Sequence, residues 1–583
     1  MINNSRLKID GDIEDFVITV NSHFEEGIEY YTISLKADDK RVPHAIKISF
    51  EVPIVGIQNK WNTAAVFRRA FELPGTAKHT FKATYGAPVE IFTDIQGRNK
   101  LCVACSDGLN PIAFKSYVHE ETAEMLCTLT LFDQETYPLS DYNITIRLDY
   151  REVMYYDALS AVSAWWESFY GYHPIYVPEY AKKPMYSTWY SFHQKLSPDA
   201  IIKQCEIAKK LGCESVIVDD GWQTEDNCRG YKFCGDWRVT ERKIPDMRDF
   251  VKSIHKIGMK FLIWYSVPFV GCRSDAWNKF QGMYLNPNEP EVRTLDPRFP
   301  EVRRYITETY LKAIREWDID GLKLDFVDCF RVAEQTQNEC IKGRDCCCVQ
   351  LGVDKLLKNI VEEAVKIKPE IMIEFRQPYT GPLMRTYGNI FRASDCPNDF
   401  MANRVRTIDL RLISGTTAVH SDMIMWNAED STQNAALQII SVLFSVPQIS
   451  VKFDEISKEQ YDMVAFWLDF WCAHNNTLLH GRLMPCNQCS NYSSVIAQSH
   501  GETIGVVYDN AVIKLDGLLQ KNNYIINGSS EGKVYFTSDK EENAICKITD
   551  CTGKAVTEEN IVIAKGINVL KVDKAEMARI IIV

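Results

Sequence analysis

The sequence predicts an α/β protein built around a (β/α)8 TIM barrel, flanked by an N-terminal β-sandwich and a small C-terminal β domain. Three observations support this prediction. Strand-like apolar runs alternate with amphipathic helical patterns in the middle of the chain. Both ends instead carry short segments in which apolar and polar residues alternate. The 583 residues are enough for two to four domains, each with its own core.

The two ends of the chain resemble each other in pattern. Residues 1–170 contain "YYTISLKA", "HAIKISFEV" and "YNITIRLDY", which are typical of the strands of a β-sandwich. Residues 484–583 return to this pattern with "TIGVVYD", "KVYFTS" and "NVLKVD". We therefore expect the barrel to occupy residues 171–483, with a β domain on each side.

Eight strands can be proposed for the barrel: "PMYSTWYSF", "ESVIVDDGW", "KFLIWYSVPF", "GLKLDFVD", "IMIEFRQP", "IFRASDC", "TTAVHSDMIMW" and "QISVKF". Amphipathic stretches lie between them. One of these, "SPDAIIKQCEIAKKLG", starts with a Ser-Pro cap signal and ends on Gly212. A doubly wound open sheet is the competing fold, but no Gly-rich phosphate loop follows the first strand. The pattern favours the barrel.

Composition and charge exclude several kinds of partner. The net charge of −12 argues against nucleic acid, and no run of Lys and Arg indicates an anionic membrane surface. The first residues, "MINNSRLKIDGDIEDF", are polar and contain no apolar region of a secretory signal. No apolar stretch is long enough to span a bilayer. We expect a cytoplasmic protein with no membrane partner.

The 19 cysteines are scattered and odd in number, which is typical of a reduced cytoplasmic protein. The run Cys346–Cys348, with Cys329 and Cys340 before it, has the ligand type for zinc. It lacks the paired CxxC spacing of a structural zinc site, so incidental thiols are the favoured interpretation. We expect no metal and no other cofactor.

In such barrels the active site lies at the carboxyl ends of the strands. Those ends carry charged and aromatic residues: Trp189, Asp219, Asp220, Trp222, Trp264, Lys323, Asp325, Asp328, Glu374, Arg376, Asp395, Asp399, His420 and Asp422. Burying a carboxylate is costly unless it is paired or functional. Several carboxylates at equivalent strand ends therefore indicate a site.

Lys323 and Asp325 are two residues apart in "GLKLDFVD", so both point to the same side of their strand, into the barrel mouth. A cation beside a carboxylate keeps it ionised at neutral pH. An ionised, positioned carboxylate can act as a nucleophile or a base. The strand thus accepts two charged residues for a chemical reason.

Each of these residues also has a structural interpretation. Asp325 could form a simple ion pair with Lys323, and the pair Asp219–Asp220 could be a turn or a helix N-cap. The tryptophans could be core residues. Asp399 follows Cys-Pro-Asn, a natural turn, and a lone histidine such as His420 is usually a satisfied buried group. Their coincidence at strand ends carries the prediction.

Carboxylates framed by tryptophans suit a carbohydrate. Indole faces stack on the apolar faces of a pyranose, and aspartates accept hydrogen bonds from its hydroxyls. Two carboxyl groups can divide glycoside cleavage between a nucleophile and a general acid.

Four motifs in order resemble the melibiase-type α-galactosidases, glycoside hydrolase family 36 and its relatives. They are "VIVDDGWQ", then "FCGDWRVTERKIPDMRDFVKSIHKIGMKFLIW", then "KLDF", then "SDCPND". The resemblance extends over about residues 184–400. It implies that Asp325 is the nucleophile and that Asp395 is the general acid/base.

The resemblance also implies a sugar-binding set. Lys323 would bind a ring hydroxyl and hold Asp325 anionic, and Asp219 and Asp220 would accept the C4 and C6 hydroxyls of galactose. The remaining substrate-binding residues that we expect are Trp189, Trp222 and Trp237 as walls of the −1 subsite, together with Trp264, Arg376 and Asp399.

The sequence departs from the family after the fifth strand. "IEFRQPYTGP" replaces a loop of the Cys-Ser-Gly-Gly type, so Glu374, Arg376 and Gln377 would face the pocket near the sugar C2. An arginine there could accept an anionic or N-acetylated sugar. The acid/base segment also has one more residue between its aspartates than is usual, which makes Asp399 the alternative to Asp395.

The sequence therefore predicts a retaining α-galactosidase that acts on an oligosaccharide or glycoconjugate, with a homo-oligomer as one option. An α-N-acetylgalactosaminidase, or a galactosyl transferase of the raffinose-synthase kind, is the alternative in the same class. A non-catalytic carbohydrate-binding barrel is a different class, less favoured because both carboxylates are present. A redox or metal enzyme using the cysteine cluster is a third.

Overall fold

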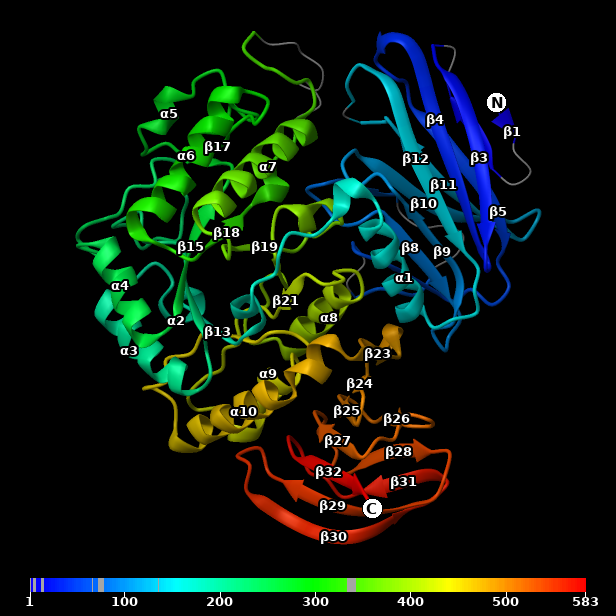
Figure 1. Ribbon diagram of the computed structural model, residues 1–583, viewed down its shortest axis with the longest axis vertical. Coiled ribbons are helices and arrows are strands. Elements are labelled where there is room, and N and C mark those ends of the chain that lie inside the picture. The colour runs from blue at the N-terminus through cyan, green and yellow to red at the C-terminus, as the bar shows by residue number, and fades with distance from the viewer. Residues whose placement is uncertain are drawn as a thin grey trace.

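The computed structural model describes residues 2–3, 7–11, 15–64, 67–71, 78–134, 136–332 and 342–583. Cys340 lies outside the described residues. Figure 1 shows three parts: N-terminal strands in blue and cyan, a central barrel in green and yellow, and C-terminal sheets in orange and red. The predicted TIM barrel with flanking β domains is confirmed.

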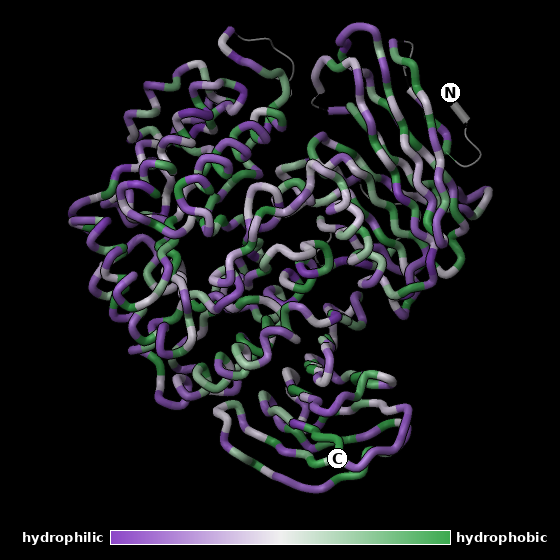
Figure 2. The backbone as a smooth tube through the Cα atoms, viewed as in Figure 1, coloured by the Kyte–Doolittle hydropathy of each residue, from purple (hydrophilic) through white to green (hydrophobic). Residues whose placement is uncertain are grey.

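The N-terminal part contains two six-stranded antiparallel sheets in the described residues. The first runs β1 (Ile2–Asn3), β2 (Lys8–Gly11), β5 (Ile46–Pro53), β11 (Glu124–Leu131), β10 (Ile112–His119) and β7 (His79–Phe81). The second runs β3 (Val17–Glu25), β4 (Ile28–Arg41), β12 (Leu139–Asp149), β9 (Asn99–Cys105), β8 (Val89–Thr93) and β6 (Asn59–Asn62). Polar and apolar residues interleave along these strands (Figure 2), and one apolar core joins both sheets.

The barrel is an eight-stranded parallel sheet in the part of the chain that the structure describes. Its strands are β13 (Met185–Ser187), β14 (Ser215–Val218), β15 (Lys260–Ser266), β18 (Gly321–Asp325), β19 (Met372–Arg376), β20 (Ile390–Arg392), β21 (Ala418–His420) and β22 (Gln448–Ile449). Each lies within one of the eight predicted segments. Parallel bridges from His420 to Val446 and from Ile424 to Ile449 bring β21 and β22 together, and β22 pairs with β13.

The α-helices are α1 (Tyr155–Glu167), α2 (Trp189–Phe192), α3 (Pro198–Lys210), α4 (Met247–Ile257), α5 (Ala276–Lys279), α6 (Pro300–Trp317), α7 (Val349–Ile367), α8 (Phe400–Arg411), α9 (Thr432–Ile440) and α10 (Lys458–His480). Short 3₁₀ helices are η1 (Tyr170–Tyr172), η2 (Glu179–Lys182), η3 (Val327–Cys329), η5 (Leu383–Thr386) and η6 (Gln488–Ser490). Helix α3 begins with proline after Ser197, as the cap signal predicts. A hairpin of β16 (Phe269–Gly271) and β17 (Val292–Thr294) follows β15.

The C-terminal part has a seven-stranded and a three-stranded sheet around a separate apolar core. The larger sheet runs β23 (Arg482–Cys486), β24 (Ser494–Ser499), β25 (Glu502–Val507), β27 (Asn522–Asn527), β32 (Met577–Ile582), β29 (Glu542–Thr549) and β30 (Ala555–Ile563). The smaller runs β26 (Val512–Lys514), β28 (Val534–Ser538) and β31 (Gly566–Leu570). Strand β23 crosses the boundary expected between residues 483 and 484.

The buried carboxylate of Asp409, on α8, joins all three parts. It accepts hydrogen bonds from Trp61 Nε1 (3.0 Å) and from Arg69 Nη2 (2.8 Å), both in the N-terminal part. It also accepts one from Tyr492 Oη (2.5 Å), in the C-terminal part.

Among the described residues, no helix combines the length and the apolar character that a bilayer crossing requires.

Candidate active site

The register of the parallel strands brings the charged strand ends together. Lys323 on β18 lies beside Trp264 on β15 and beside Glu374 on β19. Arg376 at the end of β19 lies beside Arg392 at the end of β20. Because parallel strands end at the same edge of a barrel, these side chains surround one mouth.

The carboxylate of Asp325 is held by four donors. Its Oδ1 accepts hydrogen bonds from Arg376 Nε (2.6 Å), from the backbone N–H of Phe326 (2.8 Å) and from Tyr379 Oη (3.0 Å). Its Oδ2 accepts one from Trp264 Nε1 (3.1 Å). The side chain is 10% exposed, so it is fixed but still open to the mouth.

These contacts keep Asp325 ionised. Burial by itself raises the pKa of this carboxyl. The charges of Arg376 and Lys323 and the hydrogen bond from Trp264 lower it by more than burial raises it, so the net pKa lies well below the usual range. Arg376 lowers the pKa of Asp325 more than Lys323 does, and it is the direct ion-pair partner. The structural alternative, a simple ion pair between Asp325 and Lys323, is therefore not formed, while the charge of Lys323 acts in the expected direction by lowering the pKa of Asp325.

Lys323 instead pairs with Asp219 across the barrel, from Nζ to Oδ2 at 2.5 Å. The neighbouring Asp220 is held by two amides: Gln194 Nε2 and Gln223 Nε2 each donate to it at 2.7 Å. Burial raises the pKa of Asp220 to about 6, the charge of Asp219 adds to this, and the two amide hydrogen bonds oppose it. These carboxylates belong to a bonded network and are not a helix cap.

Asp395 follows β20 and is the most open carboxylate of the group, with a side chain 52% exposed. Arg392 Nη2 donates to its Oδ1 at 2.9 Å. Burial acts to raise the pKa of Asp395, but the charges of Arg392 and Lys323 outweigh it and the net pKa is lowered. The charge of Asp325 opposes this lowering, so the two predicted catalytic carboxylates interact electrostatically.

Arg392 is fixed by a second carboxylate. Its Nη1 donates to Asp422 Oδ1 at 2.5 Å, and Asp422 Oδ2 accepts from Tyr190 Oη (2.9 Å) and from the N–H of Cys396 (2.6 Å). Asp422 is fully buried. This network orients the arginine that holds Asp395.

One of the expected aromatic walls, Trp222, is a core residue instead. Trp222 is 0% exposed, and its Nε1 donates to the carbonyl of Trp264 at 2.9 Å. Trp237 stacks on Trp222 with ring centroids 5.9 Å apart. The prediction that Trp222 walls the subsite is wrong, because a fully buried indole presents no face to a ligand. Trp237 lies behind it.

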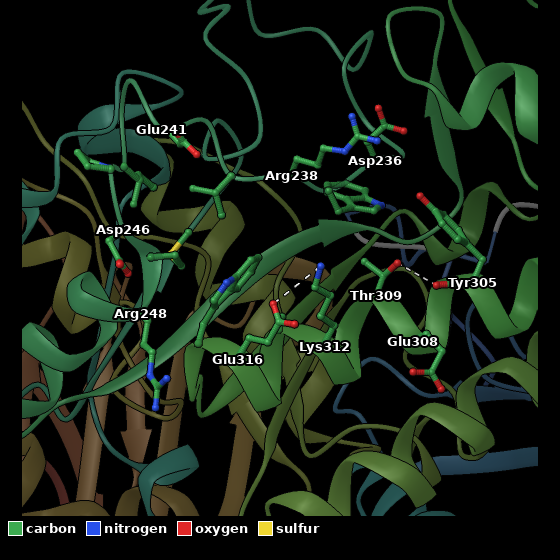
Figure 3. A pocket seen from close by; sticks show the side chains of 17 residues that line it. Asp236, Arg238, Glu241, Asp246, Arg248, Tyr305, Glu308, Thr309, Lys312 and Glu316 are labelled. Carbon is green, nitrogen blue, oxygen red and sulfur yellow. Dashed lines mark hydrogen bonds and ion pairs between the residues drawn. The ribbon is translucent and has the colours of Figure 1, made fainter.

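Trp237 belongs to a different hollow. Figure 3 shows a groove between the loop before α4 and helix α6, with a volume of about 590 Å³. Its lining includes Trp237, Tyr305 and Trp317 but neither Asp325 nor Asp395. Trp237 therefore contributes to this outer groove, while its ring also packs against Trp264 with centroids 5.9 Å apart.

Tyr231, which the sequence did not single out, takes the place of these tryptophans. Its ring stacks on Trp264 with centroids 6.2 Å apart. Burial raises the pKa of Tyr231, and the charges of Asp325 and Asp220 raise it further. Trp189 packs edge-on against His193 (4.9 Å) and under Arg229 (5.4 Å). Tyr231 lies in an irregular loop, so no periodicity marks it.

Asp399 and His420 take structural roles. Asp399 caps α8, accepting the backbone N–H of Ala402 at 2.9 Å. His420 is fully buried, and its Nε2 contacts the carbonyl of Ala181 at 2.7 Å. Burial lowers the pKa of His420 to about 4, so the ring is neutral near pH 7. Asp399 thus caps a helix, and its expected sugar contact stays a prediction.

Arg392, Tyr379, Gln194 and Gln223 also belong to the site, although the sequence did not single them out. Arg392 ends β20 and lies inside the predicted segment "IFRASDC", so a signal for its position was present in the sequence. The amides and Tyr379 lie in loops, where only the fold shows their partners.

No group of three or more His, Cys, Asp or Glu side chains in the described ranges is arranged to hold a metal ion. Among the described residues, Cys346 and Cys329 are free thiols. The described part of the cysteine cluster thus gives no support to a metal enzyme.

Fold and site together define a class: a (β/α)8 barrel whose mouth carries an ionised, clamped carboxylate opposite a more open one. Residues 152–374 match the family model described as Melibiase. That segment includes Asp219, Asp220, Lys323 and Asp325, and ends before Arg376 and Asp395. The predicted resemblance to the melibiase-type α-galactosidases is confirmed.

Individual relatives support the same assignment over part of the chain. An α-galactosidase of Escherichia coli is 28% identical over 180 residues, which cover 29% of this chain and 25% of that protein. Alpha-galactosidase 1 of Pediococcus pentosaceus is 40% identical over 141 residues, 23% of this chain and 17% of that protein. The aligned region thus spans a quarter or less of these relatives.

The solved structures extend the likeness in fold. The family 36 α-galactosidase AgaA of Geobacillus stearothermophilus superposes with a TM-score of 0.68 at 14% identity, covering 97% of this chain and 81% of that one. A variant of the same enzyme in complex with raffinose gives a TM-score of 0.66 at 13% identity, covering 99% and 86%. At these identities the comparison establishes the fold alone.

Proposed function

We propose that this protein is a retaining glycoside hydrolase that removes terminal α-galactosyl residues from an oligosaccharide or glycoconjugate. One observation carries the proposal: an ionised Asp325 shares the barrel mouth with the more open Asp395, in a chain whose barrel sequence matches melibiases. A glycosidase of this kind needs one carboxylate as nucleophile and one carboxyl group as acid and then base.

In the first step Asp325 attacks the anomeric carbon while Asp395 protonates the departing oxygen, for which Asp395 must first take up a proton against the effect of Arg392 on its pKa. A covalent glycosyl-enzyme forms, and Asp395 then takes a proton from the water that releases the sugar. The half-exposed side chain of Asp395 suits this role, because a leaving group and a water molecule must both reach it. Asp325, held by four donors, suits attack from a fixed position.

The sugar would be recognised by the network around Asp219 and Asp220. Carboxylate oxygens accept hydrogen bonds from hydroxyls, and Lys323 can donate one. Tyr231 offers a ring face beside them. A galactose with its axial O4 would direct this hydroxyl to a different point from that of glucose, so the fixed acceptors can discriminate between the two sugars.

A plain galactoside is favoured over an N-acetylated or anionic sugar. The alternative depended on Arg376 being available to the C2 substituent. In the structure Arg376 Nε is used by Asp325, and its Nη1 donates to the carbonyl of Gln377 at 2.9 Å. Transfer to a sugar hydroxyl would use the same covalent intermediate as hydrolysis, and product analysis separates the two.

A panel of p-nitrophenyl glycosides tests the proposal: α-galactoside, α-N-acetylgalactosaminide, α-glucoside and β-galactoside. We expect wild type to cleave the α-galactoside first and Asp325→Asn to lose at least about a thousandfold in kcat. NMR of the first product should show the α anomer. Release of the β anomer would contradict retention, and a folded wild type that is silent on every α-galactoside would contradict the function.

Azide separates the two carboxylates. In Asp325→Ala, azide can enter the space of the missing nucleophile, and the expected product is the β-galactosyl azide. In Asp395→Ala, azide should attack the glycosyl-enzyme and give the α-galactosyl azide. Exchanged products would reverse the two assignments.

A further inference from the structure

The two oxygens of Asp325 are bonded unequally. Oδ1 accepts from Arg376 Nε, Phe326 N and Tyr379 Oη, whereas Oδ2 accepts only from Trp264 Nε1 among the described residues. A carboxylate oxygen has two in-plane lone pairs, so three donors leave Oδ1 without free capacity. Oδ2 keeps a lone pair and is the oxygen able to attack.

Arg376 and Tyr379 form what we call the nucleophile clamp. Tyr379 is fully buried, and its hydroxyl also accepts the N–H of Phe326 at 3.1 Å. The guanidinium of Arg376 lies over the rings of Phe326 (5.2 Å) and Tyr379 (5.6 Å). Both clamp residues come from "RQPYTGP", the segment that departs from the family pattern. The clamp is thus a rigid feature of this chain.

A charge-assisted contact on the nucleophile acts differently on the two halves of the reaction. It stabilises negative charge on Asp325, which is present before attack, lost in the glycosyl-enzyme and regained on release. A stabilised carboxylate is a weaker nucleophile and a better leaving group. The lowered pKa of Asp325 agrees with this direction.

We propose that the clamp makes formation of the glycosyl-enzyme the slow step and its hydrolysis the fast one, with Arg376 and Tyr379 acting as positioning residues through Asp325. This inference rests on the proposed function and adds the order of the two rates. Arg376 is then a device for rapid release of the sugar and not a receptor for its C2 substituent.

Each half of the reaction forms one bond to C1 and breaks another. In the first half, a lone pair of Oδ2 forms the bond to C1, the bond from C1 to the aglycone oxygen breaks, and that oxygen takes the proton of Asp395. In the second half, Asp395 takes a proton from water, the water oxygen bonds to C1, and the bond from C1 to Oδ2 breaks. The electron pair of that bond returns to Asp325, where the clamp receives it.

Rapid-mixing kinetics with aryl α-galactosides of graded leaving-group acidity test the inference. For wild type we expect no burst of phenol and a kcat that falls as the leaving group becomes more basic. A burst close to one equivalent of phenol, or a kcat that does not depend on the leaving group, would overturn the inference while leaving the proposed function intact. A wild type that cleaves no α-galactoside would overturn both.

Variants of the clamp should reverse the order of the rates. In Arg376→Gln the hydrolysis of the intermediate should slow by about ten- to a hundredfold, the loss of one charge-assisted hydrogen bond. A phenol burst should appear, and mass spectrometry should find a hexose on the peptide containing Asp325. Tyr379→Phe, which removes only a hydroxyl, should produce a smaller effect of the same kind.

Controls separate this role from a structural one. Arg238→Gln removes an exposed arginine that also pairs with an aspartate, Asp275, at 2.8 Å, and it should leave the burst absent. Arg376→Lys should restore part of the fast release. If Arg376→Gln and Tyr379→Phe both fold and neither accumulates the intermediate, the clamp does not set the order of the steps.

Discussion

Lys323 Nζ and Asp219 Oδ2 lie 2.5 Å apart, which joins β18 directly to the end of β14 in the barrel mouth. Both side chains are 4% exposed, so neither charge is screened by water. Breaking such a buried pair by removing one partner leaves an uncompensated charge. Both residues of the ion pair therefore have to be substituted together if stability is to be kept.

Lys323→Met should lower the free energy of unfolding by about 3–5 kcal/mol, because Asp219 loses its cation. Adding Asp219→Asn should recover a large part of this loss without restoring activity. Chemical denaturation of both single variants and the double variant gives the coupling energy. Additive effects of the two substitutions would contradict a direct pair.

Asp220 should set the acid limb of kcat/KM near pH 6, its raised pKa, if the ionised carboxylate accepts the sugar hydroxyl. Gln223→Leu removes a hydrogen bond that favours the ionised form, so the limb should move up by about one pH unit. The pH profile of each variant is the measurement. A limb that stays in place would assign it to another group.

Asp220 should affect stability in the opposite direction to activity, because its contribution to the free energy of unfolding is larger at low pH. Its pKa is higher in the folded protein than in the unfolded chain, so its contribution is fully present below the ordinary value of 3.8 and is lost as pH rises through about 6. Asp220→Asn should therefore flatten the pH dependence of unfolding in this window. Activity should therefore be lost as pH falls below about 6, whereas the stability that Asp220 contributes is lost as pH rises through the same range.

Tyr231 and Trp237 are two aromatic residues whose substitutions can be compared. Tyr231→Ala should raise KM for an α-galactoside by about tenfold, which corresponds to ~1.4 kcal/mol of binding. Trp237→Phe, which keeps an aromatic ring against Trp222 and Trp264, should leave KM within about twofold. Steady-state kinetics of the two variants decides this, and equal effects would contradict the placement of the sugar beside Tyr231.

Asp395→Ala and Asp399→Ala should separate chemistry from capping. Asp395→Ala should lose activity most strongly on substrates with basic leaving groups, which need a proton, and least on dinitrophenyl galactosides. Asp399→Ala should cost about 1 kcal/mol of stability through the lost cap of α8 and keep kcat nearly unchanged. A collapse of kcat in Asp399→Ala would instead support the alternative acid/base.

The sequence was sufficient to predict the barrel and its central carboxylates. Each strand of the barrel lies in a predicted segment, because alternation of strands and helices is a local pattern. Asp325 was readable because it disturbs an apolar strand. Its direct ion-pair partner was not predicted, because Arg376 comes from the neighbouring strand β19, far from Asp325 in sequence.

The aromatic residues show where local patterns fail. Trp222 and Trp237 stand beside motif residues in sequence, yet Trp222 is fully buried in the core and Trp237 lines the outer groove. Which side of the barrel wall an indole occupies depends on how α6 packs against the loop before α4. Tyr231 reaches the site through that same loop, which has no period to read.

The domains and the cellular location stay predictions, and so does a homo-oligomer. No membrane-crossing helix is present among the described residues.

The carboxylate of Asp409, bonded from both flanking parts, has a consequence for how this chain can be cut or recombined. Helix α8 carries Asp409, and Arg406 of the same helix donates to the backbone carbonyl of Asp395 at 2.6 Å. Excising the barrel alone would strand a buried anion and loosen the helix that holds the catalytic loop. We therefore expect the barrel to fold and function only together with the two flanking parts. Exchange of the sandwich or of the C-terminal sheets should disable the enzyme even though the active-site residues are unchanged.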